Sequence, residues 1–355
     1  MSLYDSKTYM NDILDCANQS LDWSKLAGKS IAISGGTGMI GSYLVDLIMY
    51  RNKAYNQQTD VYVFGRNEQK ANDRFSIYAD NEYFHFVKQD INQHIAKIDG
   101  LDSINYVIHA ASNTHPVAYA SDPIGTISAN VIGTSNLLEW ASSIGCDRFV
   151  FLSSVEIYGE NKGDIDKFDE SYLGYIDCNT MRAGYPESKR TGEAMCQAYI
   201  KQKNMDIVIP RLSRIYGSTM LSTDTKAMSQ FILKGVHNEN IVLKSEGTQE
   251  YSYAYVADAV LAILKIMFDG ICGESYNVAS DESDIMLKDL AKIIADYNNK
   301  EVVFELPDAV ESAGYSKATK ATLNVNKLKN IGWVSNYTMV KGLHNTMDVL
   351  KEIGA

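Results

Sequence analysis

A glycine-rich turn stands between a short apolar strand and a helix near the beginning of the chain. The strand is expected at residues 29–34 and the helix at residues 42–50. The turn between them reads Gly35-Gly36-Thr37-Gly38-Met39-Ile40-Gly41, with its glycines spaced Gly-x-x-Gly-x-x-Gly. In such a turn the backbone can approach a pyrophosphate, and the helix N-terminus offers free amides and a positive dipole. The turn therefore predicts a dinucleotide site at the edge of a parallel sheet.

Apolar strands and helices alternate through the first part of the chain, as they do when helices cover a parallel sheet. Past residue 226 the helices and strands are shorter and follow a different pattern. We therefore predict the α/β class, with a Rossmann-type doubly wound parallel sheet and a smaller mixed α/β C-terminal substrate lobe. The first part holds strands at 61–64, 83–87, 104–109, 148–152 and 205–212, and helices at 123–143 and 186–202. The second holds helices at 226–235, 256–269, 286–297, 324–331 and 339–353, and strands at 241–243, 250–255, 275–278 and 301–304.

This change of pattern predicts the domain boundaries. Residues 1–27 are expected to form a helical extension, and residues 28–212 a dinucleotide-binding domain that also carries the catalytic residues. Residues 213–355 are expected to be mainly a substrate-binding lobe, with a return to the first domain allowed for near 245–270. In the extension, one helix over 4–26 would dock on the chain or contact a second copy. Its apolar side would consist of Ile13, Leu14, Ala17 and Leu21.

Residues at the ends of several predicted strands would surround the dinucleotide. After the second strand, where an acid would bind the ribose of NAD and an arginine the 2′-phosphate of NADP, the sequence has Gly65 and Arg66. The cofactor is therefore expected to be NAD or NADP, with a slight preference for NADP. His109 is expected to be a packed, hydrogen-bonded side chain. The expected cofactor contacts are Gly35, Thr37, Gly38, Met39, Ile40, Gly41, Arg66, Asp90, Ile91, Ala110, Ala111 and Ser112.

Tyr185 and Lys189 stand one turn apart on the helix that begins near Pro186. An ammonium close to a phenol favours the phenolate, so that a tyrosine can act as a base near neutral pH. Such a pair also occurs by chance, and its meaning depends on its neighbours. Ser154 and Glu156 follow the strand at 148–152, at the edge where open parallel sheets bind ligands. Together these residues predict a polar catalytic site, beneath a polar and aromatic loop.

Composition narrows the classes of function. The net charge of -11 speaks against nonspecific nucleic-acid binding, which relies on a broad positive surface. The five cysteines are spread along the chain without a Cys-x-x-Cys pair, which indicates free thiols in a reducing compartment and no structural zinc. No apolar run reaches membrane-spanning length, and the first residues do not read as a signal peptide. A cytoplasmic protein without a bound metal is expected.

The glycine turn, Ser154 and the Tyr185/Lys189 pair, in this order, resemble the extended short-chain dehydrogenase/reductase family, that is, the NAD-dependent epimerases and dehydratases of nucleotide sugars. The likeness covers nearly the whole chain and is greatest to UDP-glucuronate decarboxylases and nucleotide-sugar 4,6-dehydratases. The decarboxylase pattern Pro-x-x-Tyr-x-x-x-Pro-Ile-x-Thr is matched by Pro116, Tyr119, Pro123, Ile124 and Thr126. Their pattern Arg-x-x-Tyr-x-Glu-x-Lys-Arg is matched by Arg182, Tyr185, Glu187, Lys189 and Arg190.

The resemblance implies a role for each matched residue. Tyr185 would take the proton of a sugar C4 hydroxyl as a hydride passes to the nicotinamide. Lys189 would lower the pKa of Tyr185 and bind the nicotinamide ribose, and Ser154 would hydrogen-bond the same substrate oxygen. Glu156 lies where the dehydratases and decarboxylases have a carboxylate near C5, which plain 4-epimerases do not need. Val155 replaces the aspartate with which 4,6-dehydratases protonate a leaving C6 hydroxyl.

Two positions depart from the family pattern. Its Gln-x-Arg-x-Phe reads Gln249-Glu250-Tyr251-Ser252-Tyr253, so Tyr251 replaces an arginine. The asparagine of its diphosphate-binding Arg-x-x-Asn is Arg214. Because an arginine binds phosphate well, either the cation has moved or the substrate differs. The expected substrate contacts are Tyr119, Arg182, Arg214 and Tyr251.

Three hypotheses follow. The leading one is a nucleotide-sugar lyase that oxidises C4 and then uses Glu156 in an elimination or a decarboxylation. The second is a 4-epimerase or an NADP-linked ketoreductase, in which Glu156 only shapes the pocket. The third is a dinucleotide-binding regulator, which the intact Ser154, Tyr185 and Lys189 set disfavours. The resemblance also implies a homodimer that pairs the helices at 124–143 and 186–202 with their copies.

Overall fold

Among the residues that the structure describes, eight parallel strands form the main sheet. The computed structural model describes residues 2–114, 121–280, 282–305 and 319–355. Seven strands of the sheet follow the order β11-β7-β5-β4-β1-β2-β3, and β6 pairs with β7. The order reverses between β1 and β4, as in doubly wound sheets, so the predicted fold class is confirmed. The strands are β1 (Ser30–Ser34), β2 (Asp60–Gly65), β3 (Phe84–Lys88), β4 (Tyr106–His109), β5 (Arg148–Phe151), β6 (Ser153–Ser154), β7 (Ile207–Leu212) and β11 (Ser275–Val278).

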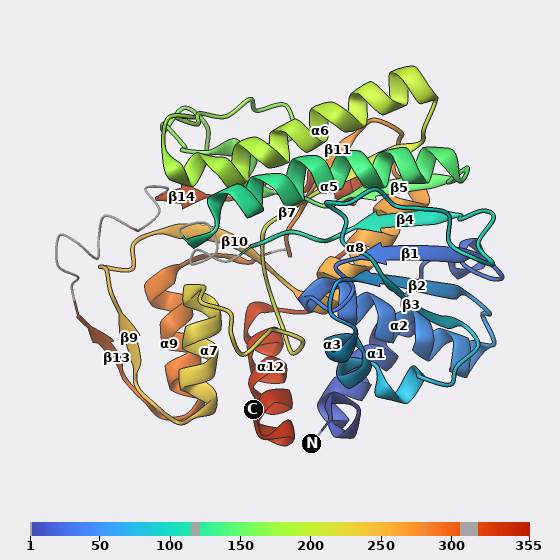
Figure 1. Cartoon of the computed structure of the whole chain (residues 1–355). Coiled ribbons are helices and arrows are strands. Elements are labelled where there is room, and N and C mark those ends of the chain that lie inside the picture. The colour runs from blue at the N-terminus through green and yellow to red at the C-terminus, as the bar shows by residue number, and fades with distance from the viewer. Residues whose placement is uncertain (1, 115–120, 281, 306–318) are drawn as a thin grey trace.

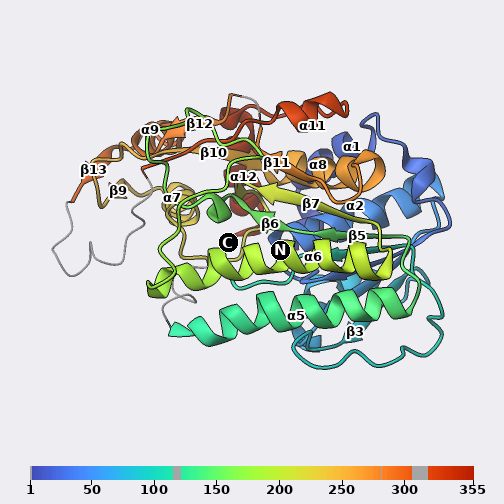
Figure 2. The ribbon, with the colours of Figure 1, turned by 90° about the horizontal axis from the view of Figure 1, so that it is seen from above.

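Helices cover both faces of this sheet. On one face, α5 (Pro123–Ser143) and α6 (Gly184–Lys203) lie side by side (Figures 1 and 2). On the other face, α2 (Met39–Tyr55) and α8 (Val256–Asp269) pack together. α3 (Glu68–Arg74) follows β2 and was not foreseen in the sequence. Among the described residues, no helix is both long and apolar enough to cross a membrane.

The N-terminal extension packs on its own chain rather than forming one long helix. Asp12 accepts hydrogen bonds from the side chains of Tyr255, Tyr337 and Asn345, which come from the second half of the chain. Leu14, expected on the apolar side, is exposed. The expected helix over 4–26 is too long, because the polar residues after Ala17 end the helical turns. The elements here are η1 (Leu3–Asp5), α1 (Lys7–Ala17) and η2 (Trp23–Lys25).

The smaller lobe holds two further sheets. The first has the order β12-β10-β14 with β8 beside β10, and the second pairs β13 with β9. The assignment of strand 275–278 to this lobe is wrong, because β11 pairs with β7 in the main sheet. α8, buried on nearly all sides, carries the chain back to that sheet. The boundary between residues 212 and 213 stays a prediction. The lobe contains β8 (Arg214–Tyr216), α7 (Ala227–Val236), β9 (Ile241–Leu243), β10 (Glu250–Tyr255), β12 (Asp284–Met286), α9 (Leu287–Tyr297), β13 (Val302–Phe304), β14 (Lys320–Ala321), α11 (Asn326–Asn330) and α12 (Met339–Ile353).

Candidate active site

The glycine turn closes tightly against the ends of β1 and β4. Gly35 has a φ of +73°, and a Cβ there would lie 2.7 Å from backbone atoms of Ala111. A Cβ on Gly41 would lie 2.5 Å from the carbonyl oxygen of Gly35. α2 begins at Met39 with Gly38 as its N-cap, and no side chain among the described residues caps it. The first amides of this helix are therefore left to a ligand such as a phosphate group.

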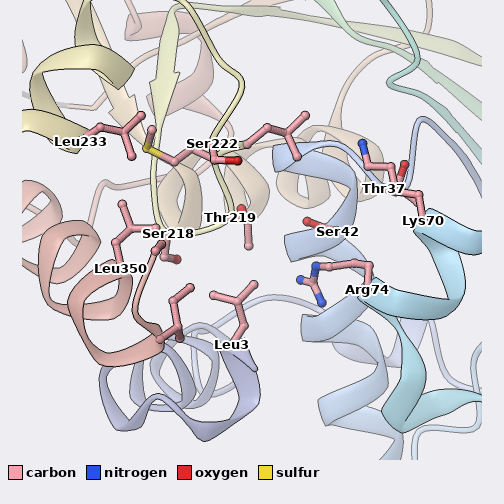
Figure 3. A pocket seen from close by; sticks show the side chains of 14 residues that line it. Leu3, Thr37, Ser42, Lys70, Arg74, Ser218, Thr219, Ser222, Leu233 and Leu350 are labelled. Carbon is pink, nitrogen blue, oxygen red and sulfur yellow. The ribbon is translucent and has the colours of Figure 1, made fainter. Parts of the chain in front are cut away.

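A cavity of about 250 Å³ borders this turn (Figure 3). Thr37 reaches it from the turn, Ser42 from α2 and Lys70 from α3. On the opposite side, the Thr219 hydroxyl donates to the Met39 carbonyl oxygen at 2.8 Å. The segment after β8 thus covers the beginning of α2. The cavity begins at the glycine turn and reaches the C-terminal helix.

The predicted cofactor contacts gather at this edge of the sheet. Ala110, Ala111 and Ser112 follow β4, and Ala111 lies against Gly35. Because Ser34 pairs with Phe64, the exposed Arg66 follows the end of β2 next to the turn. Asp90 and Ile91 come after β3, where Ile91 is buried. Its side chain packs against α5 at Gly133, whose added Cβ would lie 2.6 Å from it.

His109 is a packed, hydrogen-bonded histidine, as predicted. It is 1% exposed, with Nδ1 2.8 Å from the Ser34 hydroxyl and Nε2 3.0 Å from the Thr134 hydroxyl. Burial, with a smaller contribution from the Lys189 cation, lowers the pKa of His109 to about 3. The imidazole is therefore neutral at physiological pH and ties β1 and β4 to α5.

Ser154 and Tyr185 face each other. They share a side-chain hydrogen bond, and both are less than one-tenth exposed. The Ser154 hydroxyl also accepts a hydrogen bond from the Glu156 amide at 3.2 Å. Burial raises the pKa of Tyr185 to about 12, the Ser154 hydrogen bond lowers it less, and the Glu156 charge raises it further. A substrate hydroxyl at this point would meet a phenol and a hydroxyl that are already oriented.

The Lys189 side chain, one helical turn after Tyr185 on α6, is 3% exposed. Its ammonium donates to the Leu152 carbonyl oxygen at 2.9 Å and stands 5.1 Å from the centre of the Phe151 ring. Burial lowers the pKa of Lys189 to about 8. The expectation that Lys189 lowers the pKa of Tyr185 is not met in this structure, because burial dominates at Tyr185 and the ammonium is held by the end of β5.

Glu156 lies between two arginines. Its Oε2 accepts a hydrogen bond from Arg182 Nη2 at 3.1 Å, and its Oε1 faces Arg214 Nη2 at 3.7 Å. Arg214 in turn stacks on Tyr251, with Cζ 3.5 Å from the ring centre. Of the four predicted substrate contacts, Arg182 and Arg214 thus face Glu156, Tyr251 stacks on Arg214, and Tyr119 lies outside the described residues.

Asn130 is a site residue that the sequence reasoning did not single out. It is fully buried in α5, where its Oδ1 accepts from the Ser112 hydroxyl at 2.7 Å and its Nδ2 donates to the Ser188 hydroxyl at 2.9 Å. It therefore joins the loop after β4 to the helix of Tyr185. The available signal was an amide in the middle of a largely apolar helix, because such groups need partners when buried.

Known proteins share both the sequence pattern and the fold. Residues 31–279 match the NAD dependent epimerase/dehydratase family. UDP-glucuronic acid decarboxylase 1 of Danio rerio is 27% identical over 320 residues, which are 90% of this chain and 72% of that protein. UDP-glucuronic acid decarboxylase 6 of Arabidopsis thaliana is 30% identical over 237 residues, which are 67% of this chain and 65% of that protein.

Solved structures of similar fold come from several enzymes. A dTDP-glucose 4,6-dehydratase from Bacillus anthracis in complex with NAD has a TM-score of 0.73 at 21% identity, covering 91% of this chain and 97% of that one. A UDP-glucuronic acid 4-epimerase from Bacillus cereus, in complex with UDP-glucuronic acid and NAD, has a TM-score of 0.76 at 21% identity, covering 91% and 99%. At this identity the likeness concerns the fold.

Proposed function

Because this chain belongs to the NAD dependent epimerase/dehydratase family, we propose that it oxidises the C4 hydroxyl of a nucleotide-linked sugar and then performs a Glu156-assisted lyase step. The observation that carries the proposal is the Ser154–Tyr185 hydrogen bond, formed beside Glu156 at the sheet edge that holds the glycine turn. Relatives that are UDP-glucuronic acid decarboxylases support the lyase step.

The described residues fit a nicotinamide dinucleotide. The uncapped N-terminus of α2 and the tight glycine turn suit its pyrophosphate, and the small residues Ala110 to Ser112 follow β4 beside that turn. When bound, the dinucleotide supplies the hydride acceptor for the alcohol. We propose Lys189 as a contact of its ribose. Arg66, exposed after β2, favours NADP over NAD as the working hypothesis.

The chain's own residues would handle the protons. Tyr185 would accept the proton of the C4 hydroxyl, and Ser154 would hold the oxygen from which it leaves. A 4-keto group acidifies the C5 hydrogen, so that Glu156 could remove it and start the loss of water from C6. It could also orient a C6 carboxylate that leaves as carbon dioxide. Val155 provides no acid for a leaving C6 hydroxyl, which favours decarboxylation over dehydration.

A second candidate is a 4-epimerase or an NADP-linked ketoreductase. The observation in its favour is that both carboxylate oxygens of Glu156 face guanidinium groups. A carboxylate engaged by two guanidinium groups is held in place by the protein rather than left free to reach C5. In this alternative, Glu156 only shapes the pocket.

Product analysis separates the two candidates. Purified protein with NAD or NADP is incubated with UDP-, dTDP-, CDP- and GDP-sugars in deuterated water, and the products are identified by mass spectrometry. A lyase incorporates deuterium at C5 or releases carbon dioxide. An epimerase does neither, and a ketoreductase changes the nicotinamide absorbance in proportion to product.

We expect Glu156→Gln to stop the lyase step while the sugar is still oxidised at C4, because the amide can neither remove the C5 proton in a dehydration nor supply the charge proposed to orient the C6 carboxylate in a decarboxylation. The 4-keto sugar should then accumulate and be detected by mass. Val155→Ala, a neutral change at the neighbouring residue, serves as the control and should leave the product unchanged. Full product yield from Glu156→Gln would exclude the role proposed for this carboxylate.

A further inference from the structure

We propose that Arg214, held in place by Tyr251, binds a carboxylate at C6 of the sugar and so selects a hexuronate over a neutral hexose. This inference rests on the function proposed above and assigns a specificity residue to the same site. It explains the two departures of the sequence together, since Tyr251 stands where an arginine was expected and Arg214 where an asparagine was expected.

The strand register brings the two residues together. β8 runs parallel to β10, and Arg214 pairs with Tyr253. Tyr251 lies two residues before Tyr253 and therefore on the same face of the sheet, within reach of a long neighbouring side chain. The guanidinium carbon of Arg214 stands 3.5 Å from the centre of the Tyr251 ring, and Tyr251 is buried. Such stacking orients the plane of the guanidinium without using its N–H donors.

The charges around Glu156 leave room for one more anion. Arg182 holds Oε2 with a hydrogen bond of 3.1 Å, whereas Arg214 Nη2 faces Oε1 at 3.7 Å, which is too long for a hydrogen bond. Two guanidinium groups around one carboxylate leave one net positive charge. A carboxylate from the substrate would balance it.

Arg214 also carries a donor that needs a partner. Its Nη1 is buried and has no hydrogen-bond partner within the part of the chain that the structure describes. A buried donor without a partner is costly, and an arginine presents planar, paired donors that suit a carboxylate. Because Glu156 is proposed to face C5, the substituent next to it is C6. The occupant of the Arg214 donor is therefore inferred to be a C6 carboxylate.

Binding measurements test this assignment on the protein loaded with NAD or NADP, whichever of the two it binds more tightly. UDP-glucuronate and UDP-glucose differ only at C6, and UDP alone reports on the nucleotide and its phosphates. The wild type should bind UDP-glucuronate more tightly than UDP-glucose in calorimetry. Arg214→Gln should weaken UDP-glucuronate binding roughly ten- to hundredfold, as expected for a hydrogen bond between charged groups, and should leave UDP-glucose and UDP nearly unchanged.

Variants of Tyr251 test the coupling. Tyr251→Phe keeps the ring and should retain the preference for the uronate, whereas Tyr251→Leu should reduce it by releasing the guanidinium plane. The double variant Arg214→Asn with Tyr251→Arg moves the cation to β10. It should restore part of the preference for UDP-glucuronate that Arg214→Asn alone loses. Urea denaturation of each variant shows whether it is folded before its binding is interpreted.

The outcomes distinguish this inference from the proposed function. Equal losses for UDP-glucuronate, UDP-glucose and UDP in Arg214→Gln would place the arginine on the diphosphate and overturn the inference alone. Unchanged binding of all three compounds by Arg214→Gln would also overturn the inference. If the wild type loaded with that dinucleotide binds none of the three compounds and converts no nucleotide sugar, the proposed function fails and the inference fails with it.

Discussion

Tyr185 and Lys189 are both buried, and burial shifts their pKa values in opposite directions, upward to about 12 and downward to about 8. Both shifts favour the neutral form, since desolvation disfavours charge. The base proposed for C4 oxidation is therefore held as a phenol in this structure. Tyr185 can therefore lose its proton only if a bound ligand brings a group that stabilises the phenolate, or if the Lys189 ammonium leaves the Leu152 carbonyl and approaches it.

The shift at Lys189 predicts a pH dependence of stability. Its folded pKa of about 8 lies below the ordinary value of 10.5, so between these values the unfolded chain binds a proton that the folded chain has released. Stability should thus rise with pH in this window, by about 3 kcal/mol over the full range. Urea unfolding at pH 8 and pH 10 should show this rise in the wild type and its loss in Lys189→Met. Equal pH dependence in both proteins would contradict the shift.

At the scale of elements, the sequence pattern was most informative where a helix or strand is long and regular. α5, α8, β10 and α12 begin and end where predicted. β8 was missed, since its three residues gain their order from pairing with β10 far along the chain. For the same reason the contact between Arg214 and Tyr251 could not be predicted. The direction of the Lys189 side chain depends on a carbonyl at the end of β5, which no local pattern reveals.

The glycine turn yields a prediction about α2. Gly41→Ala should destabilise the protein by about 1–3 kcal/mol or more and abolish NAD binding, because the added methyl would meet backbone atoms of Gly35 and Gly36 that cannot move aside. Gly38→Ala is the matched control for stability, since its Cβ would meet only the Gly35 carbonyl oxygen, at 3.2 Å. Thermal unfolding and NAD titration measure both effects. A Gly41→Ala protein as stable as Gly38→Ala would show that the turn is looser than described.

At the scale of the whole molecule, the main sheet ends in a site that the smaller lobe completes. The main sheet provides Ser154 and, through α6, Tyr185, while β8 and β10 bring Arg214 and Tyr251. The polar contacts of Glu156 therefore join both parts of the chain around one carboxylate.

The outer face of α5 predicts how two copies would associate. Ile124, Ile127 and Ile132 are 78%, 42% and 47% exposed on this helix, which is unusual for large apolar side chains unless they meet a partner. We expect a homodimer through α5 and α6, and Ile132→Glu should dissociate it because a charge would be buried in the contact. Ile271→Glu, at an exposed isoleucine elsewhere, should leave it intact. Light scattering after gel filtration measures both, and a dimer that persists in Ile132→Glu would exclude this face.

We propose that the sugar is oxidised at C4 at the group of Ser154, Tyr185 and Lys189. The most direct test uses the converted nucleotide sugar with deuterium at C4, rapid quenching within one turnover, and mass analysis of the nicotinamide. In the wild type the nicotinamide should carry the deuterium, and Tyr185→Phe should form neither deuterated nicotinamide nor product. Product formation without deuterium ever reaching the nicotinamide, or undiminished turnover by Tyr185→Phe, would contradict it.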